Sequence, residues 1–126
     1  MNAADRLWVR AVRAGARLGC HQRPERSFFL LGRQMPVCAR CTGVILGQAA
    51  VFLLGRLARR VTPVKGLCFL LIILADHTAQ TLGRESTNAR RLVTGFLAGA
   101  AVGNLYKKVI IKIVKIAKRC NDAKLT

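Results

Sequence analysis

Three long apolar runs separated by basic turns constrain the fold of this chain more than any other feature. They cover residues 41–55, 66–83 and 92–106, and Asp76 is the only acidic or basic residue in them. A transmembrane helix needs about 20 predominantly apolar residues, and flanking Lys and Arg side chains can extend a shorter run. We therefore expect an all-α, small integral membrane protein, multi-pass in the cell membrane, with about three transmembrane helices at residues 41–58, 64–83 and 89–106.

Glycines recur at a spacing of four in two of these runs: Gly43 and Gly47 in the first, and Gly95, Gly99 and Gly103 in the third. A glycine inside a helix in water costs about 1 kcal/mol relative to Ala. In a bilayer the same spacing lets helices approach closely. The pattern therefore favours membrane helices and predicts a homo-oligomer that packs through these glycine faces.

Both ends of the chain are basic and amphipathic. Residues 1–18 are expected to form an interfacial helix, and residues 107–126 a basic helical tail that extends the third apolar helix. With 22 Lys and Arg against five acidic residues, the net charge is +17. We expect the partners to be the lipid bilayer and its anionic headgroups. The basic stripes are Arg6, Arg10, Arg13 and Arg17 at one end, and Lys108, Lys112, Lys115 and Arg119 at the other.

A soluble, basic, helical nucleic-acid-binding protein is the alternative that the charge leaves open. The seven aromatic residues lie mostly in the apolar runs and are not interleaved with arginines. Proteins that bind single strands need aromatic side chains exposed along a basic groove. We therefore expect no nucleic-acid partner.

If consecutive apolar helices run in opposite directions, the polar motifs lie at the same end of the helices. Residues 19–40, the end of the second run and the start of the third share that end. Lys and Arg are equally numerous on the two sides, so the positive-inside rule predicts no orientation. The convergence of three separate segments is the main argument for a functional site.

Four candidate metal ligands lie in this region. Cys38 and Cys41 form a Cys-x-x-Cys pair, and Cys20 and His21 are adjacent to each other upstream. Zinc accepts four sulfur or nitrogen ligands in a tetrahedral arrangement. We predict a zinc site built from these four residues. Two alternatives remain: a redox dithiol or disulfide between Cys38 and Cys41, and buried thiols without a special role.

Asp76 is the candidate catalytic residue, because a carboxylate within a membrane span is costly and suggests a function as an acid or proton relay. The structural alternative is an anchor for the helices, bonded to Arg91 or Gln80. His77 is a weaker candidate metal ligand. Residues 85–91 are interpreted mainly as turn and capping residues, with Ser86 or Thr87 at the start of the third helix.

Two blocks of the sequence carry a family resemblance. The first is Cys20-His21-Gln22, Pro24 to Phe28 and Pro36 to Gly43 with Gly47, and the second is Asp76, Gln80, Glu85-Ser86, Asn88, Arg91, Gly95 and Gly99. These blocks resemble the family of bacterial and archaeal predicted membrane proteins known as domain of unknown function 2085. The resemblance covers about residues 18–103 and implies a membrane protein of about three spanning helices with a cysteine-rich entry to the first. It implies no activity, and His77 is outside the family's pattern. An aromatic residue usual in the family is replaced here within residues 44–46.

Two functions follow for a zinc site in this position: structural closure of the helix ends, or Lewis-acid chemistry at the membrane surface. The first alternative is a membrane thiol-disulfide oxidoreductase that uses Cys38 and Cys41. A further alternative is a transporter subunit in which Asp76 lines a path between chains. The sequence does not decide whether the protein is an enzyme.

Overall fold

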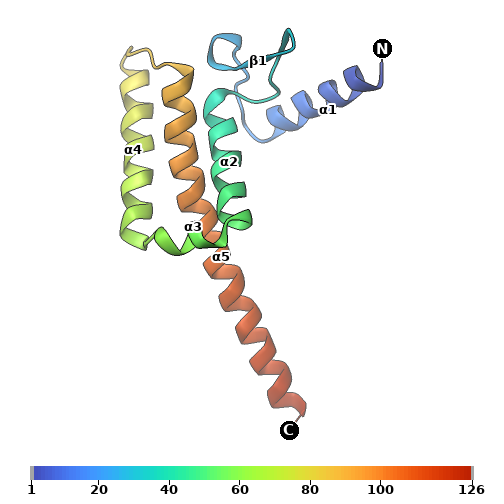
Figure 1. Cartoon of the computed structure of the whole chain (residues 1–126), viewed down its shortest axis with the longest axis vertical. Coiled ribbons are helices and arrows are strands. Elements are labelled where there is room, and N and C mark those ends of the chain that lie inside the picture. Colours follow the sequence, from blue (N-terminus) through green and yellow to red (C-terminus); the bar gives the residue numbers. More distant parts are fainter. Residues whose placement is uncertain (1, 126) are drawn as a thin grey trace.

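The computed structural model describes residues 2–125, apart from the side chains of residues 57–59 and 124–125 (Figure 1). Helices account for most of these residues, and a two-residue antiparallel hairpin lies in the connection after the first helix. The elements in chain order are α1 (Ala3–Arg17), η1 (Pro24–Arg26), β1 (Phe29–Leu30), β2 (Arg33–Gln34), α2 (Ala39–Leu53), α3 (Gly55–Arg60), α4 (Pro63–Thr81) and α5 (Asn88–Leu125).

Helices α2, α4 and α5 form a layer in which α5 lies between the other two (Figure 1). α2 and α5 run in the same direction, α4 runs in the opposite direction, and α3 crosses the lower end of the layer. The end of α4, the start of α5 and the start of α2 therefore meet at the upper end. The predicted convergence of the polar segments is confirmed by the ion pair from Arg40 to Asp76 and the hydrogen bond from Asn88 to Ser27.

The glycine faces join α2 to α5 within one chain. At four of these glycines a Cβ atom would collide with a backbone carbonyl oxygen of the facing helix, so only glycine allows this separation. The predicted homo-oligomer through these faces stays a prediction, and in the structure the faces are filled by the chain itself. The four contacts are Gly43 with Leu92, Gly47 with Phe96, Gly95 with Arg40 and Gly99 with Val44.

The first predicted helix, 41–58, is divided in two. Leu54 leaves the helical conformation with φ −101° and ψ 74°, and α3 begins at the next residue, Gly55. The start of α4 follows the sequence pattern, because Thr62 caps it and Pro63 occupies the first turn. Buried Asn104 of α5 donates to the Val61 carbonyl oxygen at 2.6 Å and so fixes this turn against the layer.

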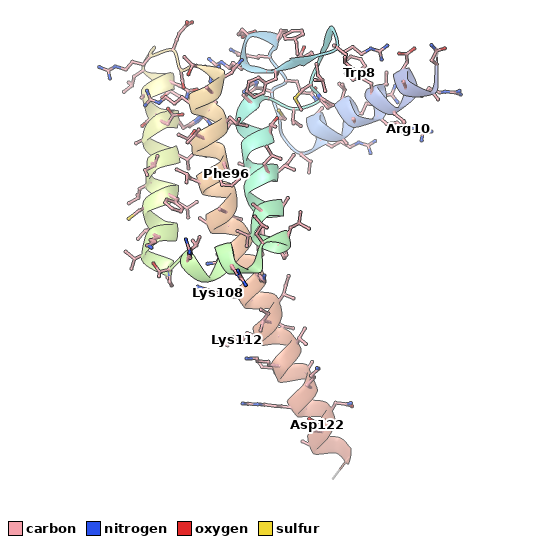
Figure 2. All side chains as sticks on the ribbon, in the orientation of Figure 1. Trp8, Arg10, Phe96, Lys108, Lys112 and Asp122 are labelled. Atoms are coloured by element: carbon pink, nitrogen blue, oxygen red, sulfur yellow. The ribbon has the colours of Figure 1, made fainter. Side chains whose placement is uncertain are left out.

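Helix α5 continues as one helix beyond residue 106, and its second half projects away from the layer (Figure 1). Thr87 caps its start by accepting a hydrogen bond from the Arg90 amide at 3.3 Å, as predicted. From Lys108 to Ala123 the side chains are exposed, Lys and Ile alike, and Figure 2 shows Lys108, Lys112 and Asp122 along this half. This half corresponds to the predicted basic helical tail.

No helix in residues 2–125 combines the length and the apolar sequence needed to cross a bilayer. The prediction of about three transmembrane helices is therefore wrong, and the multi-pass location lacks support. α2 has 15 residues, which span about 22 Å against a hydrocarbon core of about 30 Å. α4 contains Lys65 and Asp76 and ends in a polar turn, and the apolar part of α5 contains Asn104 before Lys107.

Helix α1 extends sideways from the upper part of the layer, on the side of α2, and is held by the connection that follows it (Figure 1). Trp8 donates its indole N–H to the Gln34 carbonyl oxygen at 2.9 Å. Gln22 donates to the carbonyl oxygens of Val12 and Pro36, both at 2.6 Å. These bonds hold α1 and the residues before α2 against each other. The four arginines of the predicted basic stripe on α1 are all exposed.

Candidate metal centre

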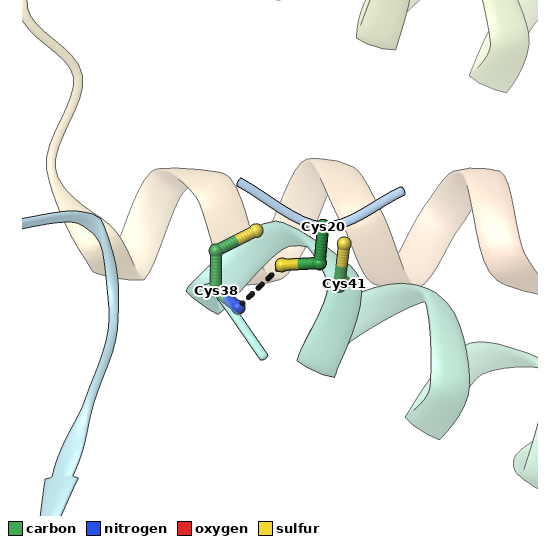
Figure 3. A group of neighbouring side chains, drawn as sticks. All are labelled: Cys20, Cys38 and Cys41. Atoms are coloured by element: carbon green, nitrogen blue, oxygen red, sulfur yellow. Dashed lines mark hydrogen bonds between the residues drawn. The ribbon is translucent and has the colours of Figure 1, made fainter. Parts of the chain in front are cut away.

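Three thiols from two segments meet at the start of α2 (Figure 3). Cys20 lies in the connection just after α1, Cys38 is the N-cap of α2, and Cys41 lies in its first turn. The three sulfur atoms lie within 4.8 Å of one another. Cys38 is buried, and the other two are half-buried. We call these three residues the thiol cluster.

The backbone of α2 contributes to the cluster directly. The Cys38 amide donates to the Cys20 sulfur at 3.2 Å, as drawn in Figure 3. The N-terminus of a helix carries a partial positive charge and unpaired N–H groups, which stabilise a thiolate. Gly19, with φ +82°, reverses the chain after α1 and brings Cys20 back to α2.

The two thiols of the Cys-x-x-Cys pair have very different acidities. A hydrogen bond from the Cys41 thiol lowers the pKa of Cys38 to about 4, outweighing the opposite effect of burial. The same hydrogen bond, together with burial, raises the pKa of Cys41. The pair therefore shares one proton near neutral pH, with Cys38 as the thiolate.

The cluster has the size and chemistry for one thiophilic ion. Zn–S bonds of about 2.3 Å in a tetrahedron place neighbouring sulfurs about 3.8 Å apart. The sulfurs are within 4.8 Å in this structure, so an ion would draw them together by about an ångström at most. Sulfur ligands of this kind suit Zn²⁺ and other soft ions.

His21, which we predicted as the fourth ligand, is not among the residues whose ligand atoms lie within 4.8 Å of one another. Its role as a ligand stays a prediction. Its Nδ1 accepts a hydrogen bond from the Arg23 amide at 3.2 Å. His77 lies on α4, where its Nδ1 is 3.2 Å from a guanidinium nitrogen of Arg40. Cys68 and Cys120 are exposed and lie on other elements. The cluster therefore supplies three ligands.

Asp76 lies near the end of α4 and is 4% exposed. Its carboxylate accepts from Arg40 at 2.7 Å and from Gln80 at 2.7 Å, and pairs with Arg90 at 2.9 Å. Gln80 was a predicted partner, whereas Arg91 was predicted but does not pair with it. Asp76 joins α2, α4 and α5, which is the anchoring role that the sequence left open. Its predicted catalytic role stays a prediction.

Sequence reasoning gave no separate functional weight to Gln22. Gln22 adopts a left-handed conformation with φ 49° and accepts from Gln34 at 2.6 Å, in addition to its two donated bonds. It fixes the path of the connection next to Cys20. The signal in the sequence was its position directly after Cys20-His21 in the resemblance block.

The comparisons with known proteins agree with the sequence resemblance. Residues 20–105 match the family model of domain of unknown function 2085, described as a predicted membrane protein. The chain belongs to this family. The match begins at Cys20 and includes the whole thiol cluster and Asp76.

Two archaeal relatives are similar over most of the same region. An uncharacterized protein of Methanocaldococcus jannaschii is 42% identical over 90 residues, which are 66% of this chain and 58% of the relative. An uncharacterized protein of Methanothermobacter thermautotrophicus is 40% identical over 93 residues, which are 70% of this chain and 84% of the relative. The matched region thus spans little more than half of the first relative. No solved structure matches the chain.

Proposed function

We propose that this chain binds one thiophilic metal ion, Zn²⁺, through Cys20, Cys38 and Cys41. The observation that carries the proposal is the convergence of three sulfur atoms within 4.8 Å from two separate segments. Thiols that are buried only as apolar side chains have no reason to lie next to one another. An ion that binds three thiols needs all three sulfur atoms in one place. The thiolate at Cys38 and the helix N-terminus prepare the site for a cation.

Three thiolates leave the fourth position of a tetrahedral ion for a ligand from outside the cluster. A site with four protein ligands closes a structure, whereas a site with three can admit water or a substrate. The three-thiol composition of the cluster is consistent with the second role, in which the ion acts at an accessible face of the protein. The half-buried Cys20 and Cys41 are consistent with such access.

Elemental analysis of the purified protein by inductively coupled plasma mass spectrometry tests this proposal. The wild type is expected to carry about one zinc per chain, and Cys38→Ser to lose it. Cys68→Ser is the matched control, because it removes an exposed thiol elsewhere. Wild-type protein that takes up no metal, even after incubation with zinc under reducing conditions, would contradict the proposal.

A thiol-disulfide oxidoreductase is the second candidate, and the low pKa of Cys38 favours it. In this function the Cys38 thiolate attacks one sulfur of a substrate disulfide and releases the other as a thiolate. Cys41 then attacks Cys38 in the mixed disulfide, which forms the Cys38–Cys41 disulfide and releases the second substrate sulfur as a thiolate. The Cys41→Ser variant is expected to accumulate a mixed disulfide at Cys38 with a small disulfide probe. Equal trapping at Cys68 in the same reaction would contradict the assignment.

We also propose that the protein binds anionic lipid headgroups at a membrane surface. The exposed arginine stripe of α1 and the exposed lysines of the projecting half of α5 support this, together with the family's description. Sedimentation with vesicles tests it. Binding is expected to vesicles that contain phosphatidylserine and to weaken when Arg10 and Arg13 are changed to Gln. Equal binding to neutral vesicles would contradict the electrostatic proposal.

A further inference from the structure

Arg91 of α5 is a buried guanidinium beside the thiol cluster. Only 6% of the residue is exposed. One of its terminal nitrogens donates to the Asn88 amide oxygen at 3.2 Å, and its buried Nε has no hydrogen-bond partner. Asn88 in turn donates to the Ser27 carbonyl oxygen, which ties this corner to the connection before α2.

The surroundings of Arg91 are strongly positive. Burial lowers its pKa first, and the charges of Arg26 and Arg40 lower it further, while Asp76 and Cys38 oppose the change. Contacts place these arginines at one corner of the protein. Asn88, which Arg91 binds, is bonded to Ser27 next to Arg26, and the Arg40 carbonyl oxygen lies against Gly95, one turn further along α5. Arg40 also has a buried Nε without a partner.

Asp76 is the buried carboxylate of the described residues, and it is already shared. It binds Arg40, the exposed Arg90 and Gln80. Within the described part of the chain, no carboxylate forms an ion pair with Arg91. The buried guanidinium of Arg91 thus has no counter-charge paired with it.

A buried cation without a counter-charge is costly, and an unpaired buried N–H adds to the cost. Such groups are retained where a ligand supplies the missing partner. A phosphate monoester has the fitting charge, about −1.5 to −2 at neutral pH, and oxygens that accept paired hydrogen bonds from a guanidinium group.

We propose that Arg91, Arg26 and Arg40 form a binding site for the phosphate group of a phosphate monoester. The inference goes beyond the proposed metal site, because the three arginines are present whether or not an ion is bound. The phosphate belongs either to a small soluble ester or to a lipid headgroup, and the chemistry of recognition is the same. Inorganic phosphate is the simplest probe of that chemistry.

Isothermal titration calorimetry with inorganic phosphate tests the site. The wild type is expected to bind one phosphate. The Arg91→Met variant is expected to bind phosphate at least about tenfold more weakly, because a charge-assisted hydrogen bond is lost. Arg84→Met removes the same charge from an exposed position and is expected to bind like the wild type. Absence of phosphate binding to the wild type, or equal binding to the wild type and Arg91→Met, would overturn the proposal.

A second variant tests the site at a residue whose substitution is not expected to unfold the protein. Arg26→Gln changes a half-buried residue of the connection outside the helical layer. It is expected to weaken phosphate binding while the helical circular dichroism spectrum is unchanged. Unchanged phosphate binding in this variant would remove Arg26 from the site and overturn the three-arginine proposal.

Two further measurements distinguish the phosphate site from the metal site and identify the source of the phosphate. Phosphate binding to the metal-free protein is measured first, so the phosphate proposal can be tested even if the protein does not bind zinc. Vesicles with phosphatidic acid are compared with phosphatidylserine vesicles of matched charge. A preference for phosphatidic acid that Arg91→Met abolishes indicates a lipid headgroup. Phosphate binding without that preference indicates a soluble ester, and both results support the proposal.

Discussion

Arg40 and Asp76 connect α2 to α4 through an ion pair of 2.7 Å, although both helices pack mainly on α5. The carboxylate is almost completely buried, and the Arg40 side chain is 19% exposed. This pair closes the upper end of the helical layer directly beside the thiol cluster.

The Asp76→Asn substitution is expected to destabilise the protein by about 3–5 kcal/mol, because it leaves the partly buried Arg40 without its counter-charge. Denaturant unfolding followed by circular dichroism measures the change. Glu85→Gln, which removes an exposed carboxylate, is the control and is expected to change stability by less than about 0.5 kcal/mol. Equal stability of the two variants would show that the ion pair contributes little.

The Gly47→Ala substitution is expected to destabilise the protein by at least about 1–3 kcal/mol, because a Cβ there meets the backbone of α5 at Phe96 and Ala100. Gly66→Ala is the matched control on α4. Its Cβ would lie 3.7 Å from the Ala101 side chain, an ordinary contact, so the gain in helix propensity of about 1 kcal/mol should remain. Thermal unfolding of the two variants is expected to shift in opposite directions.

The two upstream candidate ligands are expected to differ in their effect on metal content. Cys20→Ser removes one of the three clustered sulfurs, whereas His21→Ala removes a ring whose Nδ1 is bonded to the Arg23 amide. Zinc per chain, measured by mass spectrometry, should fall sharply in Cys20→Ser and stay near the wild-type value in His21→Ala. Loss of zinc in both variants would restore His21 as a ligand.

Alkylation of Cys38 in the metal-free protein is expected to depend little on pH above about 5. Its pKa is lowered to about 4, so the reactive thiolate persists until the pH falls through that value. In the unfolded chain the pKa is about 8.5, and the rate should fall about tenfold per pH unit below it. Peptide mass spectrometry after iodoacetamide treatment measures both rates. A folded-state profile that matches the unfolded one would show that the cluster does not stabilise the thiolate.

Local sequence chemistry predicted several features of the fold correctly. The N-terminal helix ends at Arg17, within one residue of the expected boundary, and Pro63 and Thr87 mark the starts of α4 and α5. These features depend on nearby residues only. The break at Leu54 was not predicted, because the expected helix was extended through Gly55 into the basic residues that follow it.

The membrane-spanning prediction failed because it added flanking residues to runs that were too short. In the structure α2 stops at Leu53, so the expected extension does not lengthen it. The glycine spacing was read as a membrane signal. It is explained equally by the close packing of α2 on α5, which the sequence alone does not distinguish from packing between chains.

The candidate site was predictable in outline, because an antiparallel course places its segments at one end. Its pairings were less predictable. Asp76 had several arginines within reach, and its observed partners Arg40 and Arg90 depend on the rotation of α2 and α5 about their axes. The adjacent residues Cys20 and His21 do not both face the cluster, and sequence spacing does not show which one does.

The glycine contacts between α2 and α5 divide the thiol cluster into a fixed side and a movable side. Cys38 and Cys41 belong to a helix whose backbone has no room to shift, whereas Cys20 follows Gly19 in the connection from α1. If an ion draws the sulfurs together, the segment of Cys20 must supply the movement. That segment is bonded to α1 through the Gly15 carbonyl oxygen. We therefore expect the tilt of the basic N-terminal helix to report whether the ion is bound.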